Sequence, residues 1–122
     1  MKLFILFAMI FAHIVDDYYL QGILAKMKQK KWWQENAPSE LYRNDYIVAL
    51  IIHSFSWSFM ITLPTLFVST NYIIIVFFIT LNTILHAYVD NAKANEYSIN
   101  LIVDQICHLI QIIGTWIAII II

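Results

Sequence analysis

Histidine and aspartate recur at one helical spacing in this sequence, and both residue types can bind metal ions or move protons. A His and an Asp lie four positions apart in three separate segments, so the two members of each pair share one face of a helix. This repetition predicts a single site to which several helices contribute. The three pairs are His13 with Asp17, His86 with Asp90, and Asp104 with His108.

Further polar residues extend the same faces. We expect Gln21 and Gln105 to make hydrogen bonds around the site, as we do for Asn82, Asn100 and Gln111. Lys93 is expected to neutralise Asp90, with anion binding as the alternative role.

Two residues leave their roles open at this point. His53 has no acidic partner at the same spacing, so it is interpreted as a metal ligand, a general base or a partner of Ser56. The first segment carries Asp16 beside Asp17, and the helical spacing from His13 favours Asp17 as the functional aspartate.

The elements that must position these side chains are transmembrane helices. The chain has 122 residues, of which 61% are hydrophobic and 12% charged, and its mean hydropathy is +0.75. A span needs about 20 mostly apolar residues, so the length accommodates roughly four spans. We predict an all-α, four-helix antiparallel bundle in one membrane domain, residues 1–122. The expected spans are about 2–24, 44–68, 72–93 and 98–122, with a basic loop at 25–43.

The distribution of charge predicts the orientation of the bundle. Most of the Lys and Arg residues lie between positions 26 and 43, and Lys93 lies on the same side, so this side is expected to be cytoplasmic. Both termini then lie on the non-cytoplasmic side of a bacterial inner membrane. The apolar run after Lys2 has no clear signal-peptide cleavage site, so we expect it to be retained as the first span. Pro64 is expected to bend the second span.

Composition also excludes several classes of function. A net charge of -1 provides no basic surface for nucleic acid. Cys107 is the only cysteine, which excludes an all-thiolate zinc site and an internal disulfide. We therefore expect membrane lipid as a partner and no nucleic acid, and we leave open whether the protein forms a homo-oligomer.

Ionised carboxylates in hydrocarbon cost several kcal/mol each unless they are paired or coordinated. Counting about 1.5 Å per residue from the expected cytoplasmic ends places most of the His and Asp residues roughly 9 to 16 Å deep, with Asp90 nearer the mouth. A shared divalent metal would neutralise the carboxylates, with zinc the first candidate and iron or manganese the others. Protonated histidines together with Lys93 are the alternative. The candidate metal ligands are His13, Asp17, His86, Asp90, Asp104 and His108, and the candidate catalytic residues are Asp17, His53 and Asp104.

The same residues carry a resemblance to a known family. The runs HIVDDYYLQ at 13–21, HAYVDNAK at 86–93 and DQICH at 104–108, together with His53, resemble the small bacterial and phage membrane proteins catalogued as domain of unknown function 3307. The resemblance covers nearly the whole chain but implies no activity. A weaker similarity, through the H-x-x-x-D pattern, is to membrane-bound metal-dependent hydrolases. By the likeness to the first family, the site residues are His13, Asp17, Gln21, His53, His86, Asp90, Lys93, Asp104, Gln105 and His108.

Three hypotheses about function follow. The first is a metal-dependent hydrolase that acts on a lipid or lipid-linked phosphate or ester, because no soluble lobe is expected to bind a large soluble substrate. The second is a proton or metal-ion transporter, although the polar path is expected to stop midway through the bundle. The third is a phage or bacterial membrane interaction protein in which the polar cluster only holds helices together.

Overall fold

The computed structural model describes residues 1–121, and all of its regular elements within that range are helical. The α-helices are long in the four spans and short in the basic loop. The elements in chain order are α1 (Lys2–Val15), η1 (Asp16–Leu20), α2 (Leu24–Met27), α3 (Lys30–Asn36), η2 (Glu40–Tyr42), α4 (Asp45–Thr62), η3 (Leu63–Phe67), α5 (Tyr72–Ala94), α6 (Leu101–Trp116) and η4 (Ile117–Ile121).

Four helical stretches of the described chain are long and apolar enough to cross a membrane. The first ends a few residues earlier, and the fourth begins a few residues later, than the sequence predicts. The basic loop between the first two stretches is not irregular, because it contains α2 and α3, and η2 begins the second stretch. The four stretches are Lys2–Leu20, Glu40–Phe67, Tyr72–Ala94 and Leu101–Ile121.

Local chemistry explains these boundaries. Gly22, with φ of +52°, takes the left-handed conformation that commonly follows a helix end, so it terminates the first span. The Asn100 side chain accepts a hydrogen bond of 3.0 Å from the backbone N–H of Val103 and thereby sets the start of α6. Pro64 lies in η3, where the second span changes from α-helix to 3₁₀-helix, since proline lacks the N–H that an α-helix needs.

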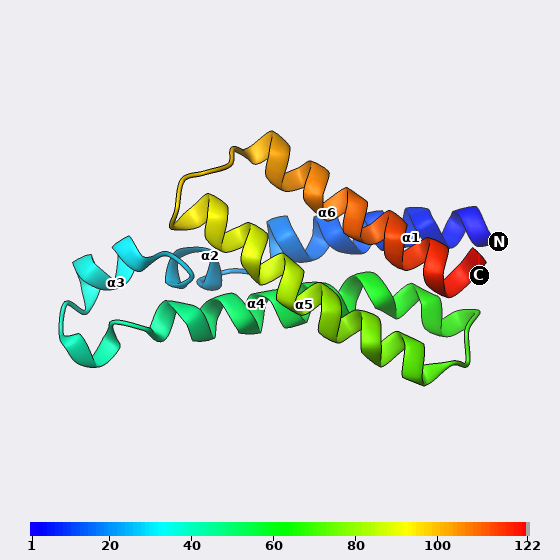
Figure 1. Cartoon of the computed structure of the whole chain (residues 1–122), viewed down its shortest axis with the longest axis horizontal. Helices are drawn as coiled ribbons and strands as arrows, with labels where there is room; N and C mark the ends of the chain where they lie inside the picture. Colours follow the sequence, from blue (N-terminus) through cyan, green and yellow to red (C-terminus); the bar gives the residue numbers. More distant parts are fainter. Residues whose placement is uncertain (122) are drawn as a thin grey trace.

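The spans form an antiparallel bundle (Figure 1). Both termini lie at one end, which we call the termini end, whereas α3 and the connection between α5 and α6 lie at the opposite end, the loop end. Helix α4 packs against α5 and α1, and α1 also packs against α6. The structure contains no membrane, so the placement of the termini on the non-cytoplasmic side stays a prediction.

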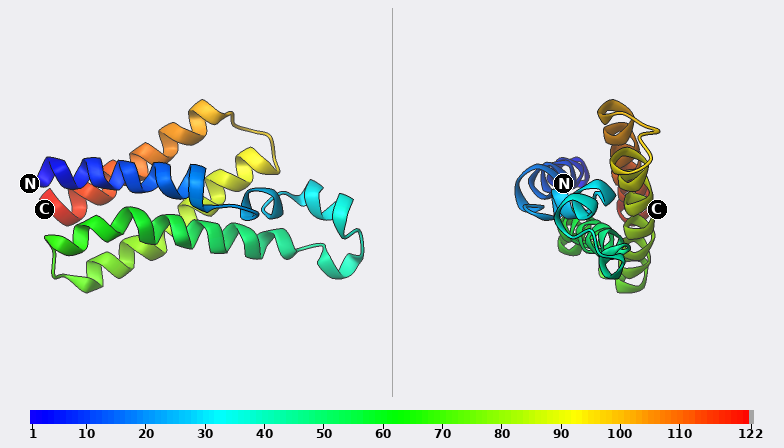
Figure 2. Two further views of the ribbon diagram at one scale, coloured as in Figure 1. Left: turned by 180° about the vertical axis from the view of Figure 1, so that it is seen from behind. Right: turned by 90° about the vertical axis from the view of Figure 1, so that its left-hand side faces the viewer.

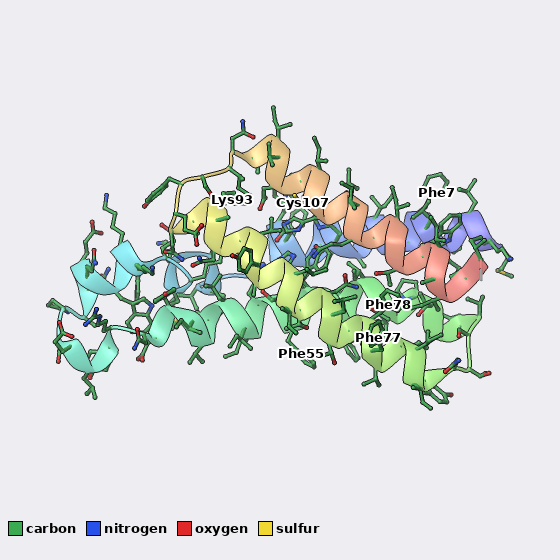
Figure 3. All side chains as sticks on the ribbon, in the orientation of Figure 1. Phe7, Phe55, Phe77, Phe78, Lys93 and Cys107 are labelled. Atoms are coloured by element: carbon green, nitrogen blue, oxygen red, sulfur yellow. The ribbon has the colours of Figure 1, made fainter. Side chains whose placement is uncertain are left out.

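Large apolar side chains cover the outside of the bundle (Figure 3). The exposed fractions of Phe7, Phe55 and Phe77 are 59%, 54% and 57%. In water such a surface would drive aggregation, whereas lipid solvates it. The exterior therefore agrees with insertion into a membrane.

The interior of the bundle has two parts. Apolar side chains pack together toward the termini end, and ionisable side chains occupy the part nearer the loop end. The apolar cluster consists of Ile5, Met9, Trp57, Ile61 and Ile112.

Candidate metal centre

Ionisable side chains from all four spans meet inside the bundle, which is the arrangement that the His and Asp spacing predicts. Three of the four histidines and Asp104 are completely inaccessible to solvent. Buried groups of this kind require partners, because lipid and packed side chains cannot replace water around a charge. The buried ionisable residues are His13, Asp16, Asp17, Lys28, His53, His86, Asp90, Asp104 and His108.

His53 of α4 lies at the centre of one half of the cluster. Its Nε2 is 3.3 Å from Asp17 Oδ1, 3.4 Å from Asp90 Oδ2 and 3.2 Å from His86 Nε2. Three residues from two other elements, Asp17 of η1 and His86 and Asp90 of α5, therefore converge on one imidazole nitrogen. His53 has no acidic partner in its own helix, but its Nε2 contacts two aspartates of other elements, Asp17 and Asp90.

His108 of α6 organises the other half. Its Nε2 is 3.4 Å from Asp104 Oδ1 and 3.6 Å from Asp90 Oδ1, and the same Asp90 oxygen is 3.7 Å from His86 Nε2. The His86 and His108 rings stack, with centroids 4.2 Å apart. Two of the three pairs predicted from the sequence, His86 with Asp90 and Asp104 with His108, therefore lie in direct proximity.

Asp90 occupies a different position from the expected one. The depth count placed it near the mouth of the site, but only 1% of its surface is exposed and it lies among three histidines. The depth calculation assumes that the helices are straight and that all of them begin at the same depth in the membrane. Tertiary packing instead brings the last turns of α5 into the bundle interior, covered by the segment that carries Lys28.

Two trios of residues have the geometry of a metal site. Asp17, His53 and His86 form one, and His86, Asp90 and His108 form the other, each with donor atoms within 4.8 Å of one another. A tetrahedral ion with ligand bonds of about 2.0–2.1 Å holds its donor atoms roughly 3.3 Å apart. The separations of 3.2 and 3.3 Å from His53 Nε2 to His86 and Asp17 match this value, and those of 3.6 and 3.7 Å from Asp90 Oδ1 to His108 and His86 are slightly longer. Both trios use Nε2 of His86, which has one lone pair, so they are alternative sites for one ion.

Donor atoms in the second trio and in the neighbouring Asp104 make no hydrogen bond. His108 Nε2, Asp90 Oδ1 and Asp104 Oδ1 are buried without a hydrogen bond in the described part of the chain. Unpaired buried polar atoms are uncommon in folded proteins because each costs about 1–3 kcal/mol. His108 Nε2 lies 3.6 Å from Asp90 Oδ1 and 3.4 Å from Asp104 Oδ1, so these oxygen and nitrogen atoms could ligate a cation together.

Two lysines neutralise part of the carboxylate charge. Lys93 Nζ lies 2.5 Å from Asp104 Oδ2, and Lys28 Nζ lies 2.6 Å from Asp90 Oδ2. The expected pairing of Lys93 with Asp90 is therefore wrong. The long Lys93 side chain extends across to the first turn of α6, and Lys28 takes its place at Asp90.

Sequence reasoning missed Lys28, which was placed in a solvated basic loop. Its exposed fraction is only 6%. Asn95 fixes the segment: its side-chain nitrogen donates to the Lys28 carbonyl at 3.0 Å, and its side-chain oxygen accepts from the Lys30 backbone N–H at 2.7 Å. No sequence pattern distinguishes this lysine from its neighbours, so only the contact with the α5–α6 connection identifies it.

His13 lies beside the two trios rather than within them. Trp57 Nε1 donates a 2.8 Å hydrogen bond to His13 Nδ1, so Nε2 carries the proton and donates to Gln105 Oε1 at 3.1 Å. Gln105 in turn donates to Asp104 Oδ2 at 3.0 Å and to Asp17 Oδ2 at 3.4 Å. The role of Gln105 as a hydrogen-bonding residue agrees with this network. The role of His13 as a ligand stays a prediction that requires it to give up one of its two bonds.

The two neighbouring aspartates of η1 both point inward, which the wider π-helical turn permits. Asp16 accepts a 2.6 Å hydrogen bond from the Ser56 hydroxyl, and its other oxygen is 3.9 Å from His53 Nδ1. Asp17 belongs to a candidate metal trio, so it matches the residue that helical spacing favours. Gln21 donates to the backbone carbonyl of Asp17 rather than to its carboxylate.

Trp57 forms the boundary between the ionisable cluster and the apolar core. It is completely buried, and its ring stacks on His86 with centroids 4.2 Å apart. Its hydrogen bond to His13 also orients that ring. On the opposite side, the cluster approaches the surface near Lys93, whose side chain is 29% exposed (Figure 3).

A family model described as "Protein of unknown function (DUF3307)" matches residues 5–122. No curated protein and no solved structure matches the chain. The match covers almost the entire described bundle, including all of the site residues, but its description assigns no activity.

Proposed function

The chain belongs to the DUF3307 family, and we propose that its buried His/Asp cluster binds a divalent metal ion and that the protein is a metal-dependent hydrolase. The proposed substrate is a lipid or a lipid-linked phosphate or ester. The family description supplies no reaction, so the proposal depends on the chemistry of the site.

The metal proposal depends on one observation: buried donor atoms around His108 make no hydrogen bond. His86, Asp90 and His108 would hold the ion, and Asp104 Oδ1, 3.4 Å from His108 Nε2, is available as a fourth ligand. We favour this trio over the alternative because Asp90 Oδ1 and His108 Nε2 make no hydrogen bond in the described part of the chain. Imidazole and carboxylate donors suit zinc, and also iron or manganese.

The balance of charge supports the same conclusion. Four buried carboxylates face two buried or half-buried lysines, and with neutral histidines the cluster is left with an excess of two negative charges. One divalent cation neutralises this excess. The cost of leaving it uncompensated in the bundle would be several kcal/mol.

The remaining groups could serve a hydrolytic reaction. A bound divalent ion would supply Lewis acidity that polarises a phosphoryl or carbonyl oxygen. His53, which faces Asp16 through Nδ1 and Asp17 through Nε2, is the proposed general base. Lys93 lies at the half-exposed edge of the cluster and would attract an anionic group. A lipid substrate fits because most of the chain lies in the four candidate spans.

Elemental analysis of the purified protein tests the metal. We expect about one divalent ion per chain, and at least a tenfold loss of metal in His86→Ala and His108→Ala. Asn82→Ala is the matched control, because Asn82 is buried on the same helix and bonds to Thr115 outside the cluster at 2.8 Å. A metal-free wild type with an intact fold would refute the proposal.

Transport is the second candidate, and a specific observation favours it. The contacts Asp104–His108, His108–Asp90 and Asp90–His53 form a continuous series of titratable groups with steps of 3.4 to 3.6 Å. The series does not continue to the termini end, where the apolar cluster of Met9, Ile61 and Ile112 lies, so a transported ion would have to pass this cluster. Proton or metal flux into liposomes that Asp104→Asn abolishes would replace the hydrolase proposal with transport.

A further inference from the structure

A separate cavity of about 400 Å³ lies among α3, η2 and the start of α4, away from the His/Asp cluster. These elements lie at the loop end of the molecule, beside the point where the second span begins (Figure 2). The walls of the cavity combine basic and aromatic side chains. The residues that matter for its chemistry are Lys30, Trp33, Glu40, Tyr42, Arg43 and Tyr46.

The cations of the cavity are available to a ligand. Arg43 Nη1 is 3.5 Å from Glu40 Oε2, and the two side chains are 74% and 87% exposed, so water weakens this pair. Lys30 Nζ lies 5.0 Å from the centre of the Tyr46 ring, which holds the ammonium group at the wall. Two cations and one carboxylate leave an excess of positive charge, which favours an anionic ligand.

The aromatic wall is fixed in place. The rings of Trp33 and Tyr42 stack with centroids 6.3 Å apart and an angle of 20° between their planes. Trp33 Nε1 donates a 2.6 Å hydrogen bond to the Met27 carbonyl, so the indole is anchored to the preceding turn. Trp and Tyr concentrate at the depth of lipid headgroups, and Lys and Arg near that level attract anionic lipid.

We propose that this cavity binds the phosphate ester of an anionic phospholipid headgroup. Arg43 and Lys30 contact the phosphate, and Trp33 and Tyr42 pack against the glycerol portion. The source of the phosphate is a lipid rather than a soluble anion, because the cavity adjoins the end of a membrane span and has an aromatic wall. This proposal is independent of the metal centre.

Native mass spectrometry of the full chain in detergent tests the proposal. The protein is titrated with phosphatidylglycerol and, separately, with phosphatidylcholine, which carries a phosphate but no net charge. We expect tighter binding of phosphatidylglycerol, and about a fivefold loss of that preference in Arg43→Gln and in Lys30→Gln. Lys31→Gln is the matched control, because Lys31 neighbours Lys30 but does not line the cavity and lies 3.8 Å from Glu35.

Three results would overturn the proposal. The first is equal binding of both lipids, which would show that the cavity does not prefer an anionic headgroup. The second is an equal loss of preference in Lys31→Gln and Lys30→Gln, which would show a diffuse effect of charge. The third is displacement of phosphatidylglycerol by millimolar inorganic phosphate, which would identify a site for soluble phosphate. Arg43→Lys keeps the charge and is expected to retain the preference, which separates loss of binding from loss of fold.

Discussion

Lys28 and Asp90 are 62 positions apart in the chain and form an ion pair of 2.6 Å inside the bundle. The side chains are 8% and 1% exposed, so the pair is shielded from water. The pair joins the connecting segment between the first two spans to the last turns of α5. Lys28 therefore covers the loop end of the candidate metal centre and supplies charge to it.

Removal of Lys28 is expected to destabilise the protein strongly. Lys28→Ala leaves Asp90 as an uncompensated buried charge, which typically costs about 3–5 kcal/mol. Lys31→Ala is the matched control, since its side chain is 70% exposed and its pair with Glu35 contributes at most about 0.5 kcal/mol. Unfolding of both variants in detergent measures the difference, and equal stabilities would contradict the buried pair.

Zinc is expected to raise the melting temperature of the wild-type protein. A ligand that binds only the folded state at a hundred times its Kd stabilises that state by about 2.7 kcal/mol. The shift should disappear in His108→Ala and persist in Asn82→Ala, whose side chain lies outside the cluster. A shift of equal size in both variants would show that zinc acts elsewhere.

The two glycines are expected to respond in opposite directions to alanine. Gly22 has φ of +52°, where an L side chain is strained, so Gly22→Ala should cost about 1 kcal/mol. An added Cβ at Gly114 meets nothing within 4 Å, and this residue lies inside α6, so Gly114→Ala should stabilise by roughly 0.5–1 kcal/mol. Thermal unfolding of the two variants measures these changes in stability, and a change of the same sign in both would contradict the backbone conformation at one of the two positions.

Cysteine labelling tests the orientation predicted by the positive charges. In a Cys107→Ser background, Ser69→Cys should react with a membrane-impermeant maleimide on intact cells, because it lies in the turn at the termini end. Glu35→Cys of α3 should react only after the membrane is permeabilised. The opposite pattern would invert the bundle and place the candidate site in the outer half of the membrane.

The number of spans and the approximate place of each could be predicted from the sequence because they depend on local composition. Twenty apolar residues in a row have few alternatives to a membrane helix, and caps such as Asn100 act on residues only three positions away. The pairing of Asp104 with His108 is local in the same way, since residues four apart on a helix must share a face.

Contacts between helices could not be predicted from spacing. His13 and Asp17 share a helix, yet the His13 ring nitrogens bond to Trp57 and Gln105, which belong to other spans. The partner of Lys93 likewise depends on how far α6 lies from α5 at their connection. Such distances depend on the rotation and crossing of several helices together, which no single segment encodes.

By itself, therefore, the sequence determined that four apolar helices carry histidines and aspartates that lipid would not accept, because both facts follow from residue types and the helical period. The packing of the helices in three dimensions settles which nitrogen faces which oxygen, and it brings Lys28 into the interior while Lys26 and Lys30 stay exposed. The physical reason is that ligand geometry and ion pairing depend on separations of a few ångströms across the bundle. Those separations are set by the packing of all the helices at once.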